Sequence, residues 1–223
     1  MRHPGGSETY HKAYHAVHLT EDAAREVVWD VLTQYLSRYV PPEAHVLELG
    51  AGYCYWINGV RAARKVAVDL WEDLPNYTAP DVQPLLLDVA GGLPGLGERQ
   101  FDVVMASNLL EHFAPEVASQ VVADVAALLR PGGRLIVLQP NFRYAYRHYF
   151  DDYTHRSIFT DVSLANLMRS HGFRIEAVHP KFMPYSLRGS RIPIKPWLIR
   201  MYLRSPIKPM AGQMLIVGQV PGP

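Results

Sequence analysis

Short apolar segments alternate with longer amphipathic segments along most of the chain, and this alternation limits the folds that it can adopt. Short runs of continuous apolar residues are typical of strands that are buried on both faces of a parallel sheet. Helical segments between such strands would cover the two faces of the sheet. The pattern predicts an α/β fold, with strands at 45–49, 66–70, 84–89, 101–106, 134–138, 174–179 and 214–220.

The expected helices begin and end at residues that commonly cap helices. Thr20 is a favourable N-cap for a first helix, which Pro41 and Pro42 would stop. The last helix would begin at Thr160 or Asp161 and end at Gly172. Two further helices are expected at 55–65 and 115–130.

Composition limits the class of protein. With 223 residues and 48% hydrophobic content, the chain can bury one core, and we expect a single domain over 1–223. A net charge of +1 argues against a general polyanion-binding protein. Cys54 is the single cysteine, so no intrachain disulfide can form. No signal peptide and no membrane-spanning run is visible, and we expect a cytoplasmic protein.

A glycine turn follows the first expected strand. Gly50 and Gly52 would let the backbone approach a ligand closely, although two glycines after a strand are often only a tight turn. Polar residues also lie at the ends of the next three strands. Asp69 ends the second strand and could accept hydrogen bonds from ribose hydroxyls, and Asp88 ends the third and could accept one from an adenine amino group. Asn108 follows the fourth strand and would face the same crevice. Together these residues indicate a nucleoside-containing cofactor.

A nicotinamide dehydrogenase would use the same crevice. Its G-x-G-x-x-G pattern requires glycine at position 55, where this chain has Tyr55. No second mononucleotide-binding half is visible either. The sequence therefore disfavours this alternative.

Five segments resemble the ordered motifs of class I S-adenosylmethionine-dependent methyltransferases, and they are most similar to the broad type 11 small-molecule group. The resemblance implies a Rossmann-like, doubly wound, seven-stranded sheet in the order 3-2-1-4-5-7-6, with strand 7 antiparallel and helices on both faces. It also implies S-adenosylmethionine as cofactor and S-adenosylhomocysteine as product. The segments are VLELGAG (46–52), VAVDL (66–70), LLLDV (85–89), FDVVMASNLLEH (101–112) and LLRPGGRLIV (128–137).

The same resemblance assigns cofactor roles to individual residues. The glycine turn would hold the methionine part, Glu48 would lie beneath it, and Asn108 would close the site. The ribose and adenine would be held at the ends of the second and third strands. The residues assigned are Glu48, Gly50, Ala51, Gly52, Asp69, Leu70, Asp88, Val89 and Asn108. The chain departs from the family at Cys54, where a third glycine is common.

Two segments could supply a catalytic base. His112 follows the fourth strand, and its ordinary pKa suits general-base catalysis, although in the resembling family this loop is often structural. In the segment 149–156, Asp152 and His155 could form an oriented base, or the segment could be a polar surface loop. Without an HExxH motif or a cysteine pair, we expect no metal site.

Acceptor-binding residues are expected around this core. Arg143, Tyr153 and Arg156 could contact an anionic acceptor. At the N-terminus, Tyr14 belongs to a group of tyrosines and histidines at helical spacing that would suit a lid, although a frayed terminus is an alternative. The expected layout is a lid and helix over 1–40, a cofactor-binding core over 45–140, and acceptor-side insertions over 141–160 and 181–210.

The C-terminal part of the chain is basic. From Ala177 to Pro223 there is no Asp or Glu, whereas seven Lys and Arg residues lie among aromatic and aliphatic ones. This segment could bind an anionic acceptor, contact a membrane surface through 188–208, form a dimer contact or cap the sheet edge. The sequence leaves monomer and homodimer open.

The function expected from the sequence is methyl transfer to a small molecule, with an oxygen of a sugar-containing or natural-product acceptor preferred over nitrogen. A nucleic-acid methyltransferase is disfavoured because SNLL follows the fourth strand in place of D/N-P-P-Y. A non-catalytic cofactor-binding scaffold or regulatory protein is the alternative from another class. No nucleic-acid partner is expected.

Overall fold

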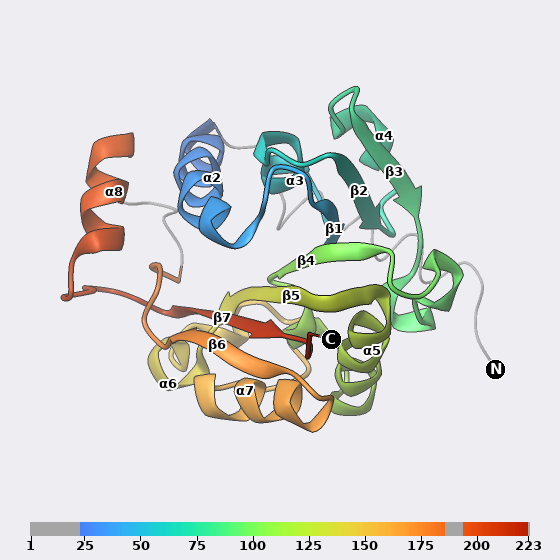
Figure 1. The fold of residues 1–223 in the computed structure, drawn as a ribbon. Coiled ribbons are helices and arrows are strands. Elements are labelled where there is room, and N and C mark those ends of the chain that lie inside the picture. The colour runs from blue at the N-terminus through green and yellow to red at the C-terminus, as the bar shows by residue number, and fades with distance from the viewer. Residues whose placement is uncertain (1–22, 186–193, 223) are drawn as a thin grey trace.

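A computed structural model describes residues 23–185 and 194–222 of the chain. The strands are β1 (His45–Leu49), β2 (Arg64–Asp69), β3 (Val82–Leu86), β4 (Phe101–Ser107), β5 (Leu129–Pro140), β6 (Arg174–His179) and β7 (Gln213–Gln219). They form one sheet in the order β3-β2-β1-β4-β5-β7-β6 (Figure 1). β7 is antiparallel to both of its neighbours, whereas the other pairs are parallel. The sheet order predicted from the resemblance is confirmed.

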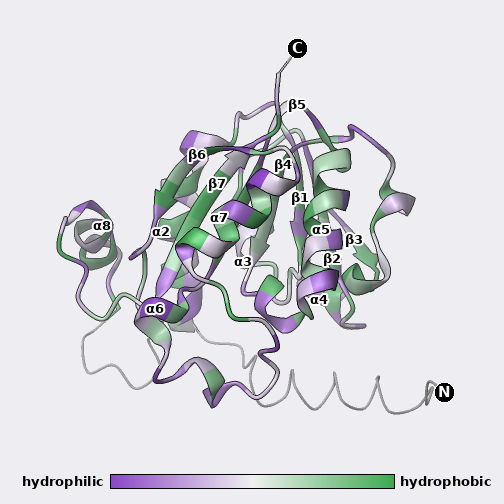
Figure 2. Ribbon diagram, turned by 90° about the horizontal axis from the view of Figure 1, so that it is seen from below, coloured by the Kyte–Doolittle hydropathy of each residue, from purple (hydrophilic) through white to green (hydrophobic). Residues whose placement is uncertain are grey.

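Helices cover both faces of the sheet because the strands are apolar on both sides. One face packs against α2 (Ala23–Leu36), α3 (Tyr55–Gly59) and α8 (Pro196–Arg204), and the other against α5 (Pro115–Leu128) and α7 (Asp161–Ser170) (Figures 1 and 2). Two buried clusters result, one on each side of the sheet. The short helices are α4 (Leu74–Tyr77) and α6 (Phe142–Ala145), and 3-10 turns lie at Ser37–Tyr39, Val89–Gly91, Pro94–Leu96, Leu110–His112 and Tyr149–Asp151.

Helix α7 has the N-cap that the sequence predicts, whereas helix α3 is shorter than the sequence predicts. Thr160 caps α7 through a reciprocal pair of hydrogen bonds with Ser163, as its residue type favours. The helix expected over 55–65 is wrong in length, because α3 ends at Gly59. The chain from Arg64 is needed for pairing with β1, and Ala63 and Arg64 already donate backbone hydrogen bonds to Ala44.

The edges of other elements also differ from the predicted ones. β3 ends at Leu86, so Asp88 lies beyond the strand and begins a 3-10 turn by accepting a hydrogen bond from the Ala90 N–H. β5 begins at Leu129, five residues before the strand expected over 134–138, and its register with β4 shifts between Phe101 and Val103. The predicted N-cap Thr20 lies outside the described residues.

Among the residues that the structure describes, no helix has the length and apolar character needed to cross a bilayer.

Candidate active site

One cavity of about 650 Å³ lies at the carboxyl ends of the central strands. Its size is in the range of small-molecule sites, and its position is where open α/β sheets bind ligands. The nine residues that the sequence assigns to the cofactor all line it, from Glu48 on β1 to Asn108 after β4. His112, Asp152 and His155 line the same cavity. The fold therefore brings the expected cofactor and acceptor residues to one continuous space.

The glycine turn after β1 adopts the backbone conformation that its residues allow. Gly50 has φ +66° and Gly52 has φ +48°, in the left-handed region that favours glycine. A Cβ at Gly50 would lie 2.9 Å from the Leu109 side chain, whereas a Cβ at Gly52 would meet no atom within 4 Å. The space beside Gly52 opens into the cavity, so a ligand can approach the backbone there.

Asp69 at the end of β2 connects this turn to the cofactor site. Its Oδ2 accepts a hydrogen bond from the Gly52 N–H at 2.8 Å, and its Oδ1 accepts one from the Trp71 N–H at 2.9 Å. Each carboxylate oxygen has a second lone pair, so both can still accept from a pair of ribose hydroxyls. The cradle and the donor chemistry thus fit S-adenosylmethionine.

Glu48 is buried beneath the glycine turn. Its Oε2 accepts a hydrogen bond from the Ile57 N–H at 3.1 Å, which ties β1 to the start of α3. Burial raises the pKa of Glu48 to about 8, and the hydrogen bond from Ile57 opposes that rise only in part. Glu48 is therefore mostly protonated at neutral pH when the cofactor is absent.

Cys54 takes the place of the third glycine common in the resembling family. It has φ +59°, so the left-handed conformation typical of glycine is retained at this position. The thiol is buried, and burial, together with the nearby Glu48 and Asp69 carboxylates, raises its pKa to about 12. Cys54 is consequently a packed and unreactive residue of the turn. Tyr53, Tyr55 and Trp56 around it all line the cavity.

The adenine end of the expected site is more exposed to solvent than the glycine turn. Asp88 is exposed, and Leu70 retains 41% of its accessible surface, whereas Val89 is buried. Asn108 has φ +48°, and its side chain lies between the Ser107 hydroxyl and the Gln213 amide.

The acceptor side is formed by two segments that backbone hydrogen bonds hold together. The carbonyl of Glu111 accepts from the N–H groups of both Arg156 and Ser157, and the Ser157 hydroxyl donates to the Phe113 carbonyl. These bonds place His155 beside His112, with ring centroids 4.9 Å apart. Residues more than forty positions apart in the sequence therefore form one cluster.

Hydrogen bonds also fix which nitrogen of His112 carries the proton. The Thr154 hydroxyl donates its one proton to Asp152 Oδ1 at 2.6 Å. It must therefore act as acceptor in its 2.8 Å contact with His112 Nδ1. Nδ1 thus carries the proton of the neutral ring, and Nε2 has the basic lone pair. Asp152 acts on His112 through Thr154, which the sequence did not indicate.

Burial controls the protonation of this cluster. Burial, with a smaller contribution from His155, lowers the pKa of His112 to about 4, and the charge of Asp152 opposes this only in part. Burial raises the pKa of Glu111 to about 8. At neutral pH His112 is neutral and can accept a proton, but it is a weaker base than the ordinary pKa expected from the sequence implies.

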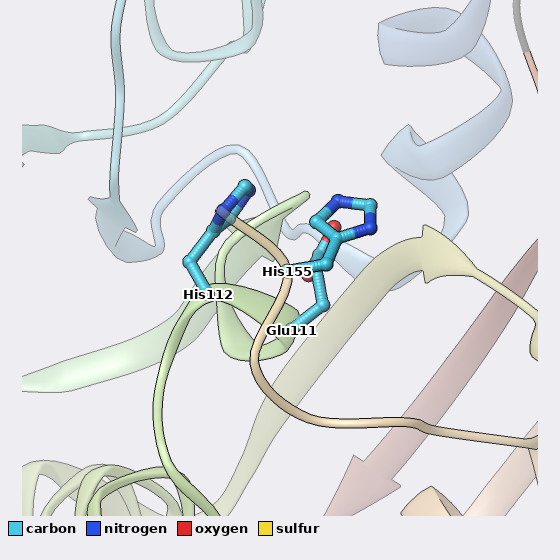
Figure 3. A group of neighbouring side chains, drawn as sticks. All are labelled: Glu111, His112 and His155. Carbon is cyan, nitrogen blue, oxygen red and sulfur yellow. The ribbon is translucent and has the colours of Figure 1, made fainter. Parts of the chain in front are cut away.

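Glu111, His112 and His155 could also hold a metal ion. Each offers one ligand atom, and these atoms all lie within 4.8 Å of one another (Figure 3). The sequence contains none of the common metal-binding motifs, because the third residue comes from a different segment.

Other predicted acceptor residues lie elsewhere. Among the described residues, Arg143, Tyr153 and Arg156 do not line the cavity: Arg143 lies 3.6 Å from Asp161, and the other two are exposed. Tyr14 lies outside the described residues. Their roles stay predictions.

Three parts of the cavity wall were not predicted. Trp29 comes from α2, Met183 and Tyr185 follow β6, and Gln213 begins β7. No local motif marks these residues, because only the tertiary fold brings them to the site.

A sequence profile of the methyltransferase domain family matches residues 21–178. The chain belongs to this family. It is a methyltransferase, and the lining of its cavity fits S-adenosylmethionine as methyl donor. A search of curated proteins found no match.

Solved structures share the fold of this methyltransferase at low sequence identity. An S-adenosylmethionine-dependent methyltransferase from Archaeoglobus fulgidus has a TM-score of 0.68 at 19% identity, covering 94% of this chain and 99% of its own. A chain in the complex between the Haloferax volcanii Trm112 methyltransferase activator and a methyltransferase has a TM-score of 0.70 at 16% identity, covering 97% of each. The 1,6-didemethyltoxoflavin-N1-methyltransferase of Burkholderia thailandensis, with bound S-adenosylhomocysteine, has a TM-score of 0.57 at 22% identity, covering 99% and 93%.

Proposed function

We propose that this methyltransferase transfers a methyl group to an oxygen of a small molecule, such as a sugar-containing or natural-product acceptor. The observation that carries the proposal is that one cavity is lined both by the cofactor residues and by His112, Asp152 and His155. An acceptor bound beside the histidines would lie next to the donor in the same cavity. Such positioning supplies much of the rate of an in-line displacement.

The residues of the site have separate tasks in this reaction. S-adenosylmethionine supplies an electrophilic methyl group on its sulfonium. Gly52 and Asp69 hold the donor, and the acceptor hydroxyl gives its proton to the histidine cluster. In the metal-free protein, Nε2 of His112 accepts that proton, because Thr154 and Asp152 keep the other ring nitrogen protonated.

Labelled methyl transfer into fractionated metabolite extracts tests the activity and identifies the acceptor. We expect label in a small molecule with an acid-stable methyl ether. Label in bulk RNA but in no small molecule would contradict the acceptor class. Cofactor binding without transfer to any acceptor class would favour a scaffold. His112→Ala should lower turnover at least tenfold, with His148→Ala on the exposed surface as control. Near wild-type turnover of His112→Ala would contradict its role as base.

Methylation of nitrogen is the second candidate. The solved relative from Burkholderia thailandensis is an N1-methyltransferase that holds its small heterocyclic substrate. A neutral amine needs no base, so nitrogen transfer would survive His112→Ala. The same variant therefore separates the two candidates.

The surface of α8 favours an anionic acceptor or an anionic membrane surface. Trp197 and Met201 are 57% and 59% exposed, and Arg200 and Arg204 lie at helical spacing on the same outward side. Ile194, just before the helix, lines the cavity. The position of Ile194 supports a peripheral contact through α8 near the cavity, within the segment 188–208 that the sequence suggests for it. A cytoplasmic location is part of the proposal, and the free Cys54 is compatible with a reducing compartment.

Sedimentation with vesicles of phosphatidylcholine and phosphatidylglycerol tests this contact. Arg200→Gln with Arg204→Gln should weaken binding by roughly tenfold or more, since each basic residue near an anionic surface contributes about 1 kcal/mol. Arg99→Gln with Arg174→Gln, which lie away from α8, is the matched control. Equal loss in both double variants would contradict a specific role of α8.

A further inference from the structure

The two rings and the carboxylate of the histidine cluster converge from two chain segments. Glu111 and His112 come from the 3-10 turn after β4, and His155 comes from the segment after β5 (Figure 3). Their three ligand atoms lie within 4.8 Å of one another. The cluster lies in the wall of the cavity, so an ion could enter from the same side as the acceptor.

The carboxyl group of Glu111 has no hydrogen-bond partner within residues 23–185 and 194–222. The residue is 0% exposed, and both Oε1 and Oε2 are buried without such a partner there. Burying a carboxyl group in this way is costly, and the cost falls when the group is paired or binds a metal. The main chain of Glu111 is held by Arg156 and Ser157, so the side chain is fixed in place without a local partner.

Both histidines have the hydrogen-bond arrangement of metal ligands. His155 Nδ1 donates to the Tyr149 carbonyl, which can only accept, so Nε2 of the neutral ring has the lone pair. His112 has the same tautomer because the Thr154 hydroxyl gives its proton to Asp152. Metal-binding histidines typically donate their other N–H to a carbonyl or a carboxylate in this way, which orients the ring toward the ion.

We propose that Glu111, His112 and His155 bind one divalent transition-metal ion. Two imidazole nitrogens and one carboxylate oxygen suit ions such as Zn²⁺, Fe²⁺ or Co²⁺ better than Mg²⁺ or Ca²⁺, which prefer oxygen ligands alone. Three protein ligands leave coordination positions open toward the cavity.

Only the role of the bound ion in methyl transfer rests on the proposed function. An acceptor oxygen at an open position of the ion would be held beside the methyl donor, and His112 would then be a ligand and not the base. Ion binding itself can be measured without acceptor or methyl donor.

Titration with Zn²⁺ after treatment with a chelator tests the site. The background is a quadruple variant, His3→Gln, His11→Gln, His15→Gln and His18→Gln, so that the N-terminal histidines do not contribute. We expect one ion per chain. Glu111→Gln and His155→Gln should each weaken binding by at least about 100-fold, and His148→Gln, on the exposed surface, should leave it unchanged. Two cluster variants are used because the second still tests the site if the first fails to fold.

Substitutions at Thr154 test whether the ion binds to histidines that are held in a fixed orientation or binds nonspecifically. Thr154→Val removes the hydroxyl that orients His112 and should weaken Zn²⁺ binding about tenfold, whereas Thr154→Ser should restore it. Co²⁺ gives a second readout, since its visible absorption reports nitrogen and oxygen ligands directly. Absence of binding, or binding that the cluster variants leave unchanged, would overturn the inference. Failure of the proposed function would appear separately, as S-adenosylmethionine that does not bind or is not used.

Discussion

Glu48 and Glu111 are buried carboxyl groups in the same cavity, and both have a pKa raised to about 8 by burial. They differ in their partners. Glu48 accepts a hydrogen bond from the Ile57 N–H, whereas neither oxygen of Glu111 has a partner among the described residues. A hydrogen bond within the chain therefore accounts in part for the burial of Glu48, and the burial of Glu111 is what the proposed metal site would explain.

The largest expected effect concerns the pH dependence of stability. The folded-state pKa of Glu48 lies above its ordinary value of 4.5, so the folded protein holds a proton that the unfolded chain releases. The free energy of unfolding should fall as pH rises from about 5 to 8, by at most roughly 5 kcal/mol from this group. Glu48→Gln should remove this part of the slope in urea unfolding of the cofactor-free protein. Glu116→Gln on the exposed side of α5 is the control, and parallel slopes for Glu48→Gln and wild type would contradict the assignment.

The next prediction tests whether the cofactor side binds independently of the acceptor side. Asp69→Ala removes the acceptor for the ribose hydroxyls and the tie to Gly52. It should weaken S-adenosylmethionine binding by about 2–3 kcal/mol, or roughly 30- to 150-fold, in calorimetry. Glu111→Gln should change that affinity less than about twofold. An Asp69→Ala affinity within twofold of wild type would show that the ribose is held elsewhere.

Replacing each glutamate by methionine tests the difference in partners directly. Glu48→Met leaves the buried Ile57 N–H without an acceptor, whereas Glu111→Met leaves no group unpaired. In chelator-treated protein, Glu111→Met should therefore be more stable than Glu48→Met by about 1–3 kcal/mol in denaturant unfolding. Equal stabilities would show that Glu111 has a partner in solution.

The smallest expected effect is at the adenine end. Asp88 is exposed, so water competes for the hydrogen bond that it would accept from the adenine amino group. Asp88→Ala should weaken S-adenosylmethionine binding by only about 1 kcal/mol, or roughly fivefold. A loss as large as that of Asp69→Ala would mean that the bound state buries Asp88.

The cofactor side could be predicted from the sequence because its residues lie at or just beyond the carboxyl end of a strand. Parallel strands end at one edge of the sheet, so Gly50, Asp69, Asp88 and Asn108 must lie together once the sheet order is known. Capping signals also gave α7 correctly, because Thr160 acts within four residues of its partner Ser163. Such local or topological rules need no knowledge of side-chain packing.

The acceptor side could be predicted only in part. His112, Asp152 and His155 were expected as candidates, but their mutual contacts depend on the Glu111 carbonyl, which pairs with Arg156 and Ser157 more than forty residues away. The orienting role of Thr154 depends on the direction of one hydroxyl proton. The length of α3 was wrong because pairing of Arg64 with β1 overrides helix propensity there.

The segment after Asp152 alternates between the interior and the surface. His155, Ser157 and Phe159 are buried, whereas Arg156 and Ile158 are exposed. The side chains of His155 and Ser157 contact His112 and Phe113, at and just after the 3-10 turn at Leu110–His112, whereas the side chains of Arg156 and Ile158 face solvent. Selection, or directed evolution in the laboratory, could thus change the outer residues to suit new acceptors while the reactive cluster keeps its geometry.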